Sequence, residues 1–195
     1  MSQSGQAHGY SELQIIEGCK RGDRKFQEIL YHQFSSKLFA ICWRYAANSE
    51  AAQDLLQDGW VKVFNNIDKF RGDGSFEGWL KRIFVNTSIE SFRKKSNNLF
   101  VVSDGEASQI TDTFETAVDQ LQEDDILKVI QTLSNGYRTI FNLYVIEGYT
   151  HKDIAEKLGI TEGTSKSQLA RAKQILQTKL NDLYDTKTKK GLIIN

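Results

Sequence analysis

The stretch from Asp68 to Lys95 constrains the fold most strongly, because a glycine-rich loop in it leads directly into a long helical pattern. The loop reads RGDGS over residues 71–75, and glycine, aspartate and serine all favour turns. Ser75 is suited to cap the helix that follows. Since the chain contains no proline, nothing forces that helix to stop before Lys95. The sequence therefore predicts a loop followed by a helix over about 75–95.

One face of this predicted helix carries polar and aromatic side chains. By helical periodicity one stripe contains Trp79, Arg82, Asn86 and Arg93, and another contains Phe76, Leu80 and Ile83. The first stripe can be the solvated edge of an ordinary amphipathic helix. It also suits single-stranded nucleic acid, because aromatic rings stack on bases, an amide can contact a base edge and cations contact phosphates. The pattern alone leaves both interpretations open.

Charge is segregated along the chain, although its 25 basic and 25 acidic residues cancel. Residues 97–125 contain acidic side chains but no lysine or arginine, whereas residues 166–190 are rich in lysine and arginine. Local charge decides nucleic-acid binding, so net neutrality does not exclude it. The hydrophobic content of 39% is that of an ordinary globular protein.

The cysteines and the apolar runs indicate a cytoplasmic protein. Cys19 and Cys42 are too few and too far apart for a zinc site, and each lies among apolar neighbours, so we expect reduced, partly buried thiols. No apolar run is long enough to cross a bilayer, and the polar N-terminus lacks the apolar core of a signal peptide. We therefore expect no direct membrane insertion.

Three helices are predicted before the loop, over about 11–18, 22–45 and 49–66. In the third, the apolar spacing turns Ala52, Leu55, Leu56, Trp60 and Val63 inward. Its opposite face carries Asp54, Gln57, Asp58, Val61 and Asn65, with Trp60 and Phe64 at the border. This face is either simply solvated or a partner surface with a small apolar centre.

The composition changes after the fourth predicted helix and divides the chain. We predict an all-α fold of two small helical domains, 1–96 and 119–195, joined by a flexible acidic linker over 97–118. The helical period returns from about 119, breaks at residues 134–136 and continues through Tyr144 and Val145 to Gly148.

The last strong pattern is a short helix, a glycine turn and a longer helix. Thr150 and Asp153 form a capping-box start, Gly159 supplies the turn, and Thr161 caps the second helix. On that helix Leu169, Ala172, Leu176 and Leu180 face the core, while Thr164, Ser167, Gln168 and Arg171 face outward. This arrangement is typical of the helix-turn-helix, whose second helix enters the DNA major groove, although plain helical hairpins share it.

Three runs of the sequence resemble sigma factors of the extracytoplasmic-function group of the sigma-70 family. FRGDGSFEGWLKRIFVNT resembles their promoter-melting segment, DLLQDGWVKVF the segment that grips RNA polymerase, and YTHKDIAEKLGITEGTSKSQLARAKQILQTKL their minus-thirty-five reader. The likeness covers nearly the whole chain except the N-terminal tail, the linker and residues 186–195. It implies core RNA polymerase and promoter DNA as partners, control by an anti-sigma factor, and no cofactor, metal or small-molecule substrate.

The resemblance also assigns residues to three sites. Minus-ten contacts are expected at Arg71, Ser75, Phe76, Trp79, Arg82, Asn86, Arg93 and Lys94. Minus-thirty-five contacts are expected at Thr150, Glu162, Gly163, Thr164, Lys166, Ser167, Gln168 and Arg171. Core-polymerase contacts are expected at Asp54, Gln57, Asp58, Trp60, Val61 and Phe64. The chain departs from the family pattern at Gly59-Trp60, at Ser165 and Gln168, and in lacking a proline near Ser134.

The sequence thus predicts a dissociable sigma factor that directs promoter-specific initiation. The acidic linker is either a solvated tether or, as the resemblance suggests, a segment that enters a basic channel of the polymerase. The alternative function is a stand-alone helix-turn-helix regulator that binds duplex DNA directly, which leaves the Trp79–Arg82–Asn86 stripe without a purpose. An enzyme has little support, because the three histidines are scattered and no nucleophile stands at motif spacing from a base.

Overall fold

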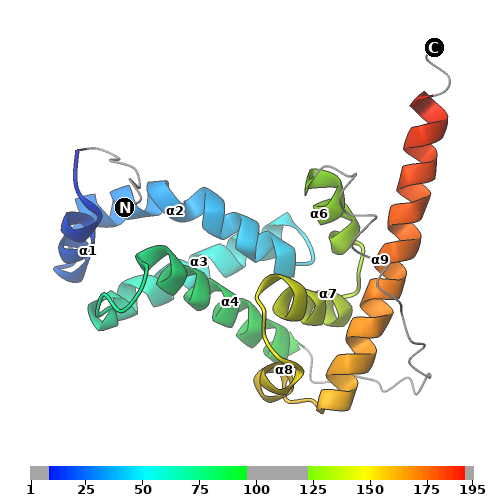
Figure 1. The fold of residues 1–195 in the computed structure, drawn as a ribbon. Helices are drawn as coiled ribbons and strands as arrows, with labels where there is room; N and C mark the ends of the chain where they lie inside the picture. The colour runs from blue at the N-terminus through cyan, green and yellow to red at the C-terminus, as the bar shows by residue number, and fades with distance from the viewer. Residues whose placement is uncertain (1–8, 96–122, 192–195) are drawn as a thin grey trace. The chain divides into compact units, whose positions relative to one another are not determined.

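The computed structural model describes the backbone of residues 9–95 and 123–191, and all of its described elements are helical (Figure 1). The chain forms two compact units that divide at Ser91, near the end of helix α4. The predicted all-α class is confirmed. The predicted linker over 97–118, and with it the proposed boundaries at 96 and 119, lies outside the described residues and stays a prediction.

The first unit begins with α1 (Glu12–Lys20), which Ser11 and Gln14 cap reciprocally. The predicted end near Gly18 is wrong, because this glycine lies within the helix where α1 packs against α2 (Arg24–Tyr45). A Cβ atom at Gly18 would lie 2.2 Å from the ring of Phe26. The glycine therefore serves close helix packing, and Arg21 rather than Gly18 follows the last turn.

The core of the first unit lies between α2, α3 (Ser49–Asn66) and α4 (Phe76–Lys95). Asp23 and Asn48 cap α2 and α3, and the short 3-10 turn η1 (Ile67–Lys69) follows α3. The predicted inward residues of α3 are all buried: Ala52, Leu55, Leu56, Trp60 and Val63. Side chains of α2 and α4 are buried as well, among them Leu30, Leu38, Leu80 and Phe84.

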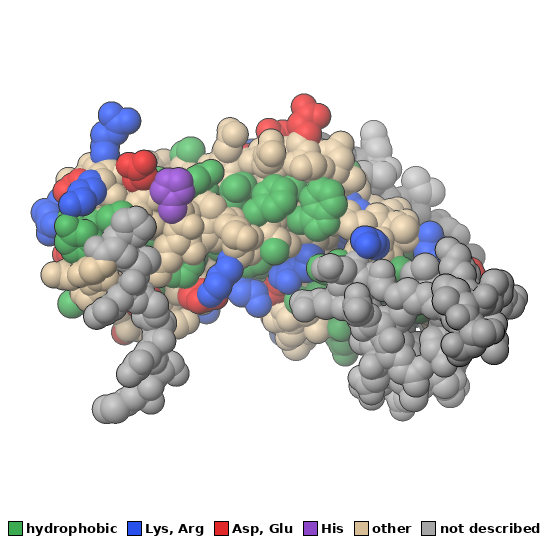
Figure 2. All heavy atoms as spheres, turned by 90° about the horizontal axis from the view of Figure 1, so that it is seen from above, with side chains coloured by type: hydrophobic (Ala, Val, Ile, Leu, Met, Phe, Trp, Pro, Cys, Tyr) green, Lys and Arg blue, Asp and Glu red, His purple; other side chains and the backbone are tan. Residues whose placement is uncertain are grey.

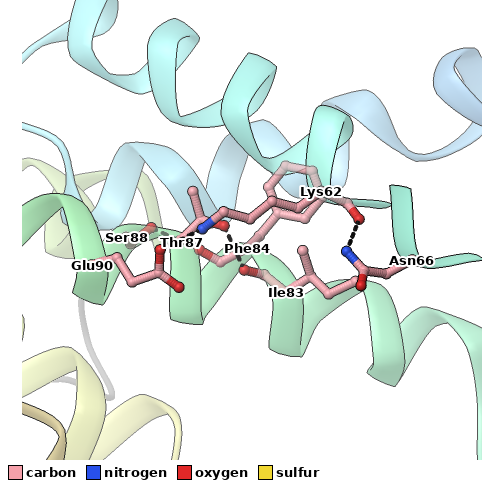
Figure 3. Close-up of polar contacts among 7 residues, drawn as sticks. All are labelled: Lys62, Asn66, Ile83, Phe84, Thr87, Ser88 and Glu90. Carbon is pink, nitrogen blue, oxygen red and sulfur yellow. Dashed lines mark hydrogen bonds and ion pairs between the residues drawn. The ribbon is translucent and has the colours of Figure 1, made fainter. Parts of the chain in front are cut away.

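Contacts of Phe84 and Glu90 hold α4 against α3 (Figure 3). The Phe84 ring occupies the space beside Gly59 that a larger residue would fill. Nearby, the Lys62 ammonium lies 2.6 Å from the Glu90 carboxylate and so links the two helices at the surface. Thr87 and Ser88 are buried in α4, and each satisfies its hydroxyl by donating to the carbonyl oxygen four residues earlier.

The second unit contains α6 (Glu123–Gln131), α7 (Asn135–Phe141), a π-helical turn η2 (Asn142–Ile146), α8 (His151–Leu158) and α9 (Glu162–Gly191). Arg138 is 2% exposed, and its guanidinium donates to Gln131 O at 3.0 Å and to Asn135 Oδ1 at 2.6 Å. Arg138 thereby fixes the turn between α6 and α7.

The predicted helical period through Tyr144 and Val145 is interrupted. α7 gives way to the π-helical turn η2, and both side chains are exposed there, by 38% and 44%. Tyr149 N–H donates to Leu143 O at 2.9 Å, so the chain after η2 turns at Gly148 with φ of 74°. This turn delivers the chain to the start of α8.

Neither a membrane-spanning helix nor a cluster of metal ligands is found among the described residues. None of the described helices has the length and apolar character needed to span a membrane. Across the same part of the chain, no group of three or more histidine, cysteine, aspartate or glutamate residues is placed to hold a metal ion. Figure 2 shows hydrophobic, basic and acidic side chains interspersed on one face.

Candidate polymerase and nucleic-acid interfaces

The outer face of α3 is a candidate partner surface. Asp54, Gln57, Asp58 and Asn65 are exposed, and Val61 among them is 60% exposed. Because Leu55, Leu56 and Val63 anchor the opposite face in the core, helical periodicity holds these four polar residues and Val61 on one side. The result is an acidic face with one apolar residue at its centre, as the sequence predicted.

Trp60, expected among the polymerase contacts, is instead a core residue. It is 4% exposed and packs between Tyr31 at 5.3 Å, Phe64 at 5.4 Å and Phe84 at 5.8 Å, measured between ring centroids. Trp60 falls on the apolar, inward face of α3, although it directly precedes the exposed Val61. Phe64 is half-buried and stacks on Trp60, so Trp60 supports this border from beneath.

The loop over residues 71–75 and the start of α4 form a second candidate site. Gly72 and Gly74 have φ of 83° and 97°, a left-handed conformation that favours glycine. The Ser75 hydroxyl accepts from Gly78 N–H at 3.1 Å, which is the predicted cap of α4. Arg71 and Ser75 are exposed, so the loop presents its side chains to solvent.

Aromatic rings support the exposed side of this site. Trp79 is half-buried and stacks on Phe76, with ring centroids 5.6 Å apart and an interplanar angle of 19°. Phe76, expected as a direct DNA contact, is 1% exposed and packs against Phe70 and Phe34. Phe76 therefore belongs to the core that holds Trp79, and Trp79 is the ring that a base can reach.

The rest of the predicted stripe continues from Trp79 along α4. Arg82, Arg93 and Lys94 are exposed, and Asn86 is half-buried. Leu80, Phe84 and Val85 occupy the opposite side of the helix in the core. The structure thus places an aromatic ring, an amide and cations on the outer side of one rigid helix.

The helix-turn-helix forms the third candidate site. The Thr150 hydroxyl accepts from Asp153 N–H at 3.1 Å, and the Asp153 carboxylate accepts from Thr150 N–H at 3.0 Å. The Thr150 hydroxyl also donates to Asp153 Oδ2 at 2.6 Å, and this bond, followed by the one from Thr150 N–H, lowers the pKa of Asp153. The reciprocal bonds confirm the predicted capping box of α8. Gly159 ends α8 with φ of 69°, and Thr161 Oγ1 accepts from Thr164 N–H at 3.0 Å to cap α9.

The predicted contact residues at the start of α9 differ in solvent exposure. Glu162, Gly163, Lys166 and Arg171 are exposed, whereas Thr164, Ser167 and Gln168 are half-buried. The Thr164 hydroxyl bonds to that of Thr161, and the Ser167 hydroxyl donates to Thr164 O. The predicted core positions Leu169, Ala172, Leu176 and Leu180 are all buried. Among the predicted contacts on α9, Arg171 and Lys166 are therefore the exposed basic side chains.

Sequence reasoning missed the pair formed by His151 and Ser165. Ser165 is 0% exposed, and its hydroxyl lies 2.9 Å from Nδ1 of His151 across the junction of α8 and α9. The missed signal is a serine at a core position of the second helix, which needs a polar partner once it is buried.

The three candidate sites lie in segments that match known protein families. The model for sigma-70 region 2 matches residues 30–98, and the model for sigma-70 region 4 matches residues 123–176, together well over half of the chain. The chain belongs to the sigma-70 family. The region 2 match contains α3, the loop and α4, and the region 4 match contains the helix-turn-helix.

Individual relatives of this sigma factor belong to the extracytoplasmic-function (ECF) group. An ECF RNA polymerase sigma-E factor of Haemophilus influenzae is 26% identical over 188 residues, which cover 91% of this chain and 99% of the relative. The ECF sigma factor SigW of Bacillus subtilis is 27% identical, covering 86% and 96% of the two chains. A Bartonella quintana sigma factor, solved in complex with an anti-sigma factor, is 25% identical with a TM-score of 0.46, covering 80% and 96%.

Proposed function

We propose that this sigma factor holds core RNA polymerase through the outer face of α3, opens the minus-ten element with the 71–75 loop and α4, and reads the minus-thirty-five element with α9. The observation that carries the proposal is the order of two family regions along one chain, each with its expected polar residues exposed or half-buried. The presence of region 2 does not imply the presence of region 4, and the reverse is also true. Together they form the pair of DNA readers that a dissociable polymerase subunit needs.

Polymerase binding is assigned to Asp54, Gln57, Asp58 and Val61. Exposed carboxylates around one apolar side chain suit a basic partner surface with an apolar centre, because charge sets orientation and the buried apolar contact adds affinity. Phe64 lies at the edge of this face, where Trp60 supports it.

Minus-ten recognition is assigned to the exposed side of α4. Trp79 offers a ring to an unstacked base, Asn86 an amide to a base edge, and Arg82 a cation to the phosphate chain. The Phe76 ring beneath Trp79 restricts the indole, so little side-chain freedom is lost when a base stacks on it.

Minus-thirty-five recognition is assigned to the first turns of α9. Arg171 suits a guanine or a phosphate, Gln168 an adenine, and Lys166 a phosphate. Two small readers on one chain bind strongly only when the polymerase holds them at the right separation. The isolated protein is therefore expected to bind promoter DNA poorly.

The remaining partners follow from the same assignment. The sigma factor works beside the polymerase in the cytoplasm, contributes no catalytic step of its own, and is held inactive by an anti-sigma factor that covers these faces. The polymerase carries out the chemistry. A stand-alone regulator is not favoured, because the region 2 match has no purpose in it.

Transcription by the reconstituted holoenzyme tests the proposal. Bacterial core RNA polymerase is combined with this chain and a pool of random-sequence duplexes, and the sequences of the transcribed templates are read. We expect two shared boxes upstream of the start sites. Arg171→Ala should weaken selection at the upstream box alone, while Arg24→Ala, which removes an exposed cation of α2, should change neither. Footprinting of a specific duplex by the isolated chain at physiological salt would overturn the proposal in favour of a stand-alone regulator.

A further inference from the structure

Three elements of the second unit meet at the ring of His151. Its Nδ1 lies 2.9 Å from the hydroxyl of Ser165 on α9. The Tyr144 ring, from η2, stacks on the imidazole with centroids 4.4 Å apart and an interplanar angle of 24°. His151 itself is the first residue of α8. One side chain therefore touches the turn before the helix-turn-helix and both of its helices.

Ser165, the partner of His151 on α9, lies where a small movement of the helix would affect DNA reading. Ser165 is 0% exposed, and its N–H donates to Thr161 O at 3.0 Å in the first turn of α9. The adjacent residues Thr164 and Lys166 are among the assigned minus-thirty-five contacts. Rotation or tilt at this point would move those side chains relative to base edges, which accept hydrogen bonds only over a narrow range of distance and angle.

The hydrogen bond supplies a restraint that an apolar contact lacks. An apolar side chain in the place of Ser165 would pack without a fixed direction. A hydroxyl bonded to a ring nitrogen fixes both distance and direction. The stacked Tyr144 ring restricts the imidazole from a second element.

Burial of His151, helped by nearby lysines, favours a bond between neutral groups. Burial and the neighbouring Lys166 lower the pKa of His151, Lys173 acts in the same direction, and Glu162 opposes them. At neutral pH the ring is therefore uncharged and acts as a hydrogen-bonding partner.

We propose that His151 and Ser165 are positioning residues for minus-thirty-five recognition: their hydrogen bond, supported by Tyr144, fixes the register of α9 against α8 and so sharpens the choice of base sequence. The inference rests on the proposed reading of that element by α9. Neither residue needs to touch DNA for this role.

Four variants separate the hydrogen bond from the ring stacking. Ser165→Ala removes the hydroxyl, and His151→Phe keeps a ring for Tyr144 but removes the ring nitrogen. His151→Asn removes the ring but keeps a polar atom near the position of Nδ1. Tyr144→Phe preserves the stacked ring and serves as the matched control.

The measurement is the selectivity of the holoenzyme on duplexes randomised across the minus-thirty-five segment. The quantity compared is the enrichment of the best sequence relative to its single-mismatch neighbours. An unfolded fraction lowers all enrichments equally, so this ratio reports positioning rather than folding. We expect the ratio to fall about fivefold for Ser165→Ala and for His151→Phe, because a lost hydrogen bond is worth about that factor.

The pattern across variants decides the outcome. The Ser165→Ala/His151→Phe double variant should be no less selective than either single variant, since both remove one bond. His151→Asn and Tyr144→Phe should keep the wild-type ratio. Unchanged ratios in both single variants, or independent additive losses in the double variant, would overturn the inference. A wild-type holoenzyme that selects no upstream sequence would instead contradict the proposed function.

Discussion

The ring of Phe84 on α4 sits directly over the backbone of Gly59 on α3, so closely that a Cβ atom at residue 59 would lie 2.2 Å from Cε1 of the ring. α3 carries the proposed polymerase face, and α4 carries the proposed minus-ten stripe. The contact therefore sets the spacing between two functional faces.

Gly59→Ala should destabilise the first unit by about 1–3 kcal/mol, because the added methyl group must displace a buried aromatic ring. The measurement is urea unfolding followed by tryptophan fluorescence, since all three tryptophans lie in the first unit. Phe84→Leu should recover part of the loss in the double variant. Gly163→Ala is the control for adding a methyl group to a helix, because its nearest neighbour would be 3.7 Å away. Since Gly163 lies in the second unit, which has no tryptophan, its unfolding is followed by circular dichroism. A stable Gly59→Ala protein would contradict the close contact.

Trp79→Ala should abolish or strongly reduce promoter opening while leaving polymerase binding intact. The reason is the loss of a half-exposed ring for base stacking, worth about 1–3 kcal/mol per base. Permanganate reactivity of unpaired thymines in the minus-ten element measures opening. Trp79→Phe should retain most of it, and Phe76→Leu should cause a partial loss because it removes the ring beneath Trp79. Full promoter opening by Trp79→Ala would contradict a role of Trp79 in minus-ten recognition.

Both cysteines should resist thiol reagents in the folded protein. Burial raises the pKa of Cys42 to about 12, and burial followed by the nearby Asp23 raises the pKa of Cys19 to about 11. Almost none of either thiol is ionised at pH 8, and the thiolate is the reactive form. Neither should react with a disulfide reagent until urea is added. Rapid labelling of Cys19 in the folded protein would contradict the expectation of a buried, unreactive thiol.

Acidification should destabilise the second unit through His151. Its pKa is lowered in the folded state by burial and by Lys166 and Lys173, with Glu162 opposing. The unfolded chain therefore takes up a proton that the folded chain does not, so stability is full above the ordinary pKa of 6.5 and falls as the pH drops below it. The depressed pKa of Asp153 acts only below its ordinary value of 3.8. The free energy of unfolding is measured in urea from amide signals of α8 and α9. Between about pH 6.5 and pH 5 it should fall less in His151→Phe than in the wild type. An equally steep fall in the free energy of unfolding of that variant would show that a group other than His151 causes the pH dependence.

Periodicity and capping chemistry predicted most of the fold. The inward faces of α3 and α9 followed from apolar spacing, and Ser75, Thr150, Gly159 and Thr161 marked helix ends because their side chains or backbone freedom suit those positions. Gly18 misled the prediction for the opposite reason. A glycine can end a helix or admit a close neighbour, and only the position of Phe26 distinguishes the two.

Contacts between distant residues could not be read from spacing. Trp60 and Phe76 were expected to contact partners, yet rings from other helices bury both. The π-helical turn exposes Tyr144 and places it on His151, although His151 had looked isolated in the sequence. Local pattern thus identified the faces of the site, and packing decided which of their side chains a partner can reach.

Association with core RNA polymerase tests the central assignment most directly. The purified chain should comigrate with bacterial core RNA polymerase on size-exclusion chromatography, and Asp54→Ala/Asp58→Ala should abolish comigration without loss of stability because both carboxylates are exposed. Glu12→Ala/Glu28→Ala removes two exposed charges from other helices and should comigrate like the wild type. Failure of the wild-type chain to comigrate, together with a shift of duplex DNA by the chain alone, would contradict its role as a polymerase subunit.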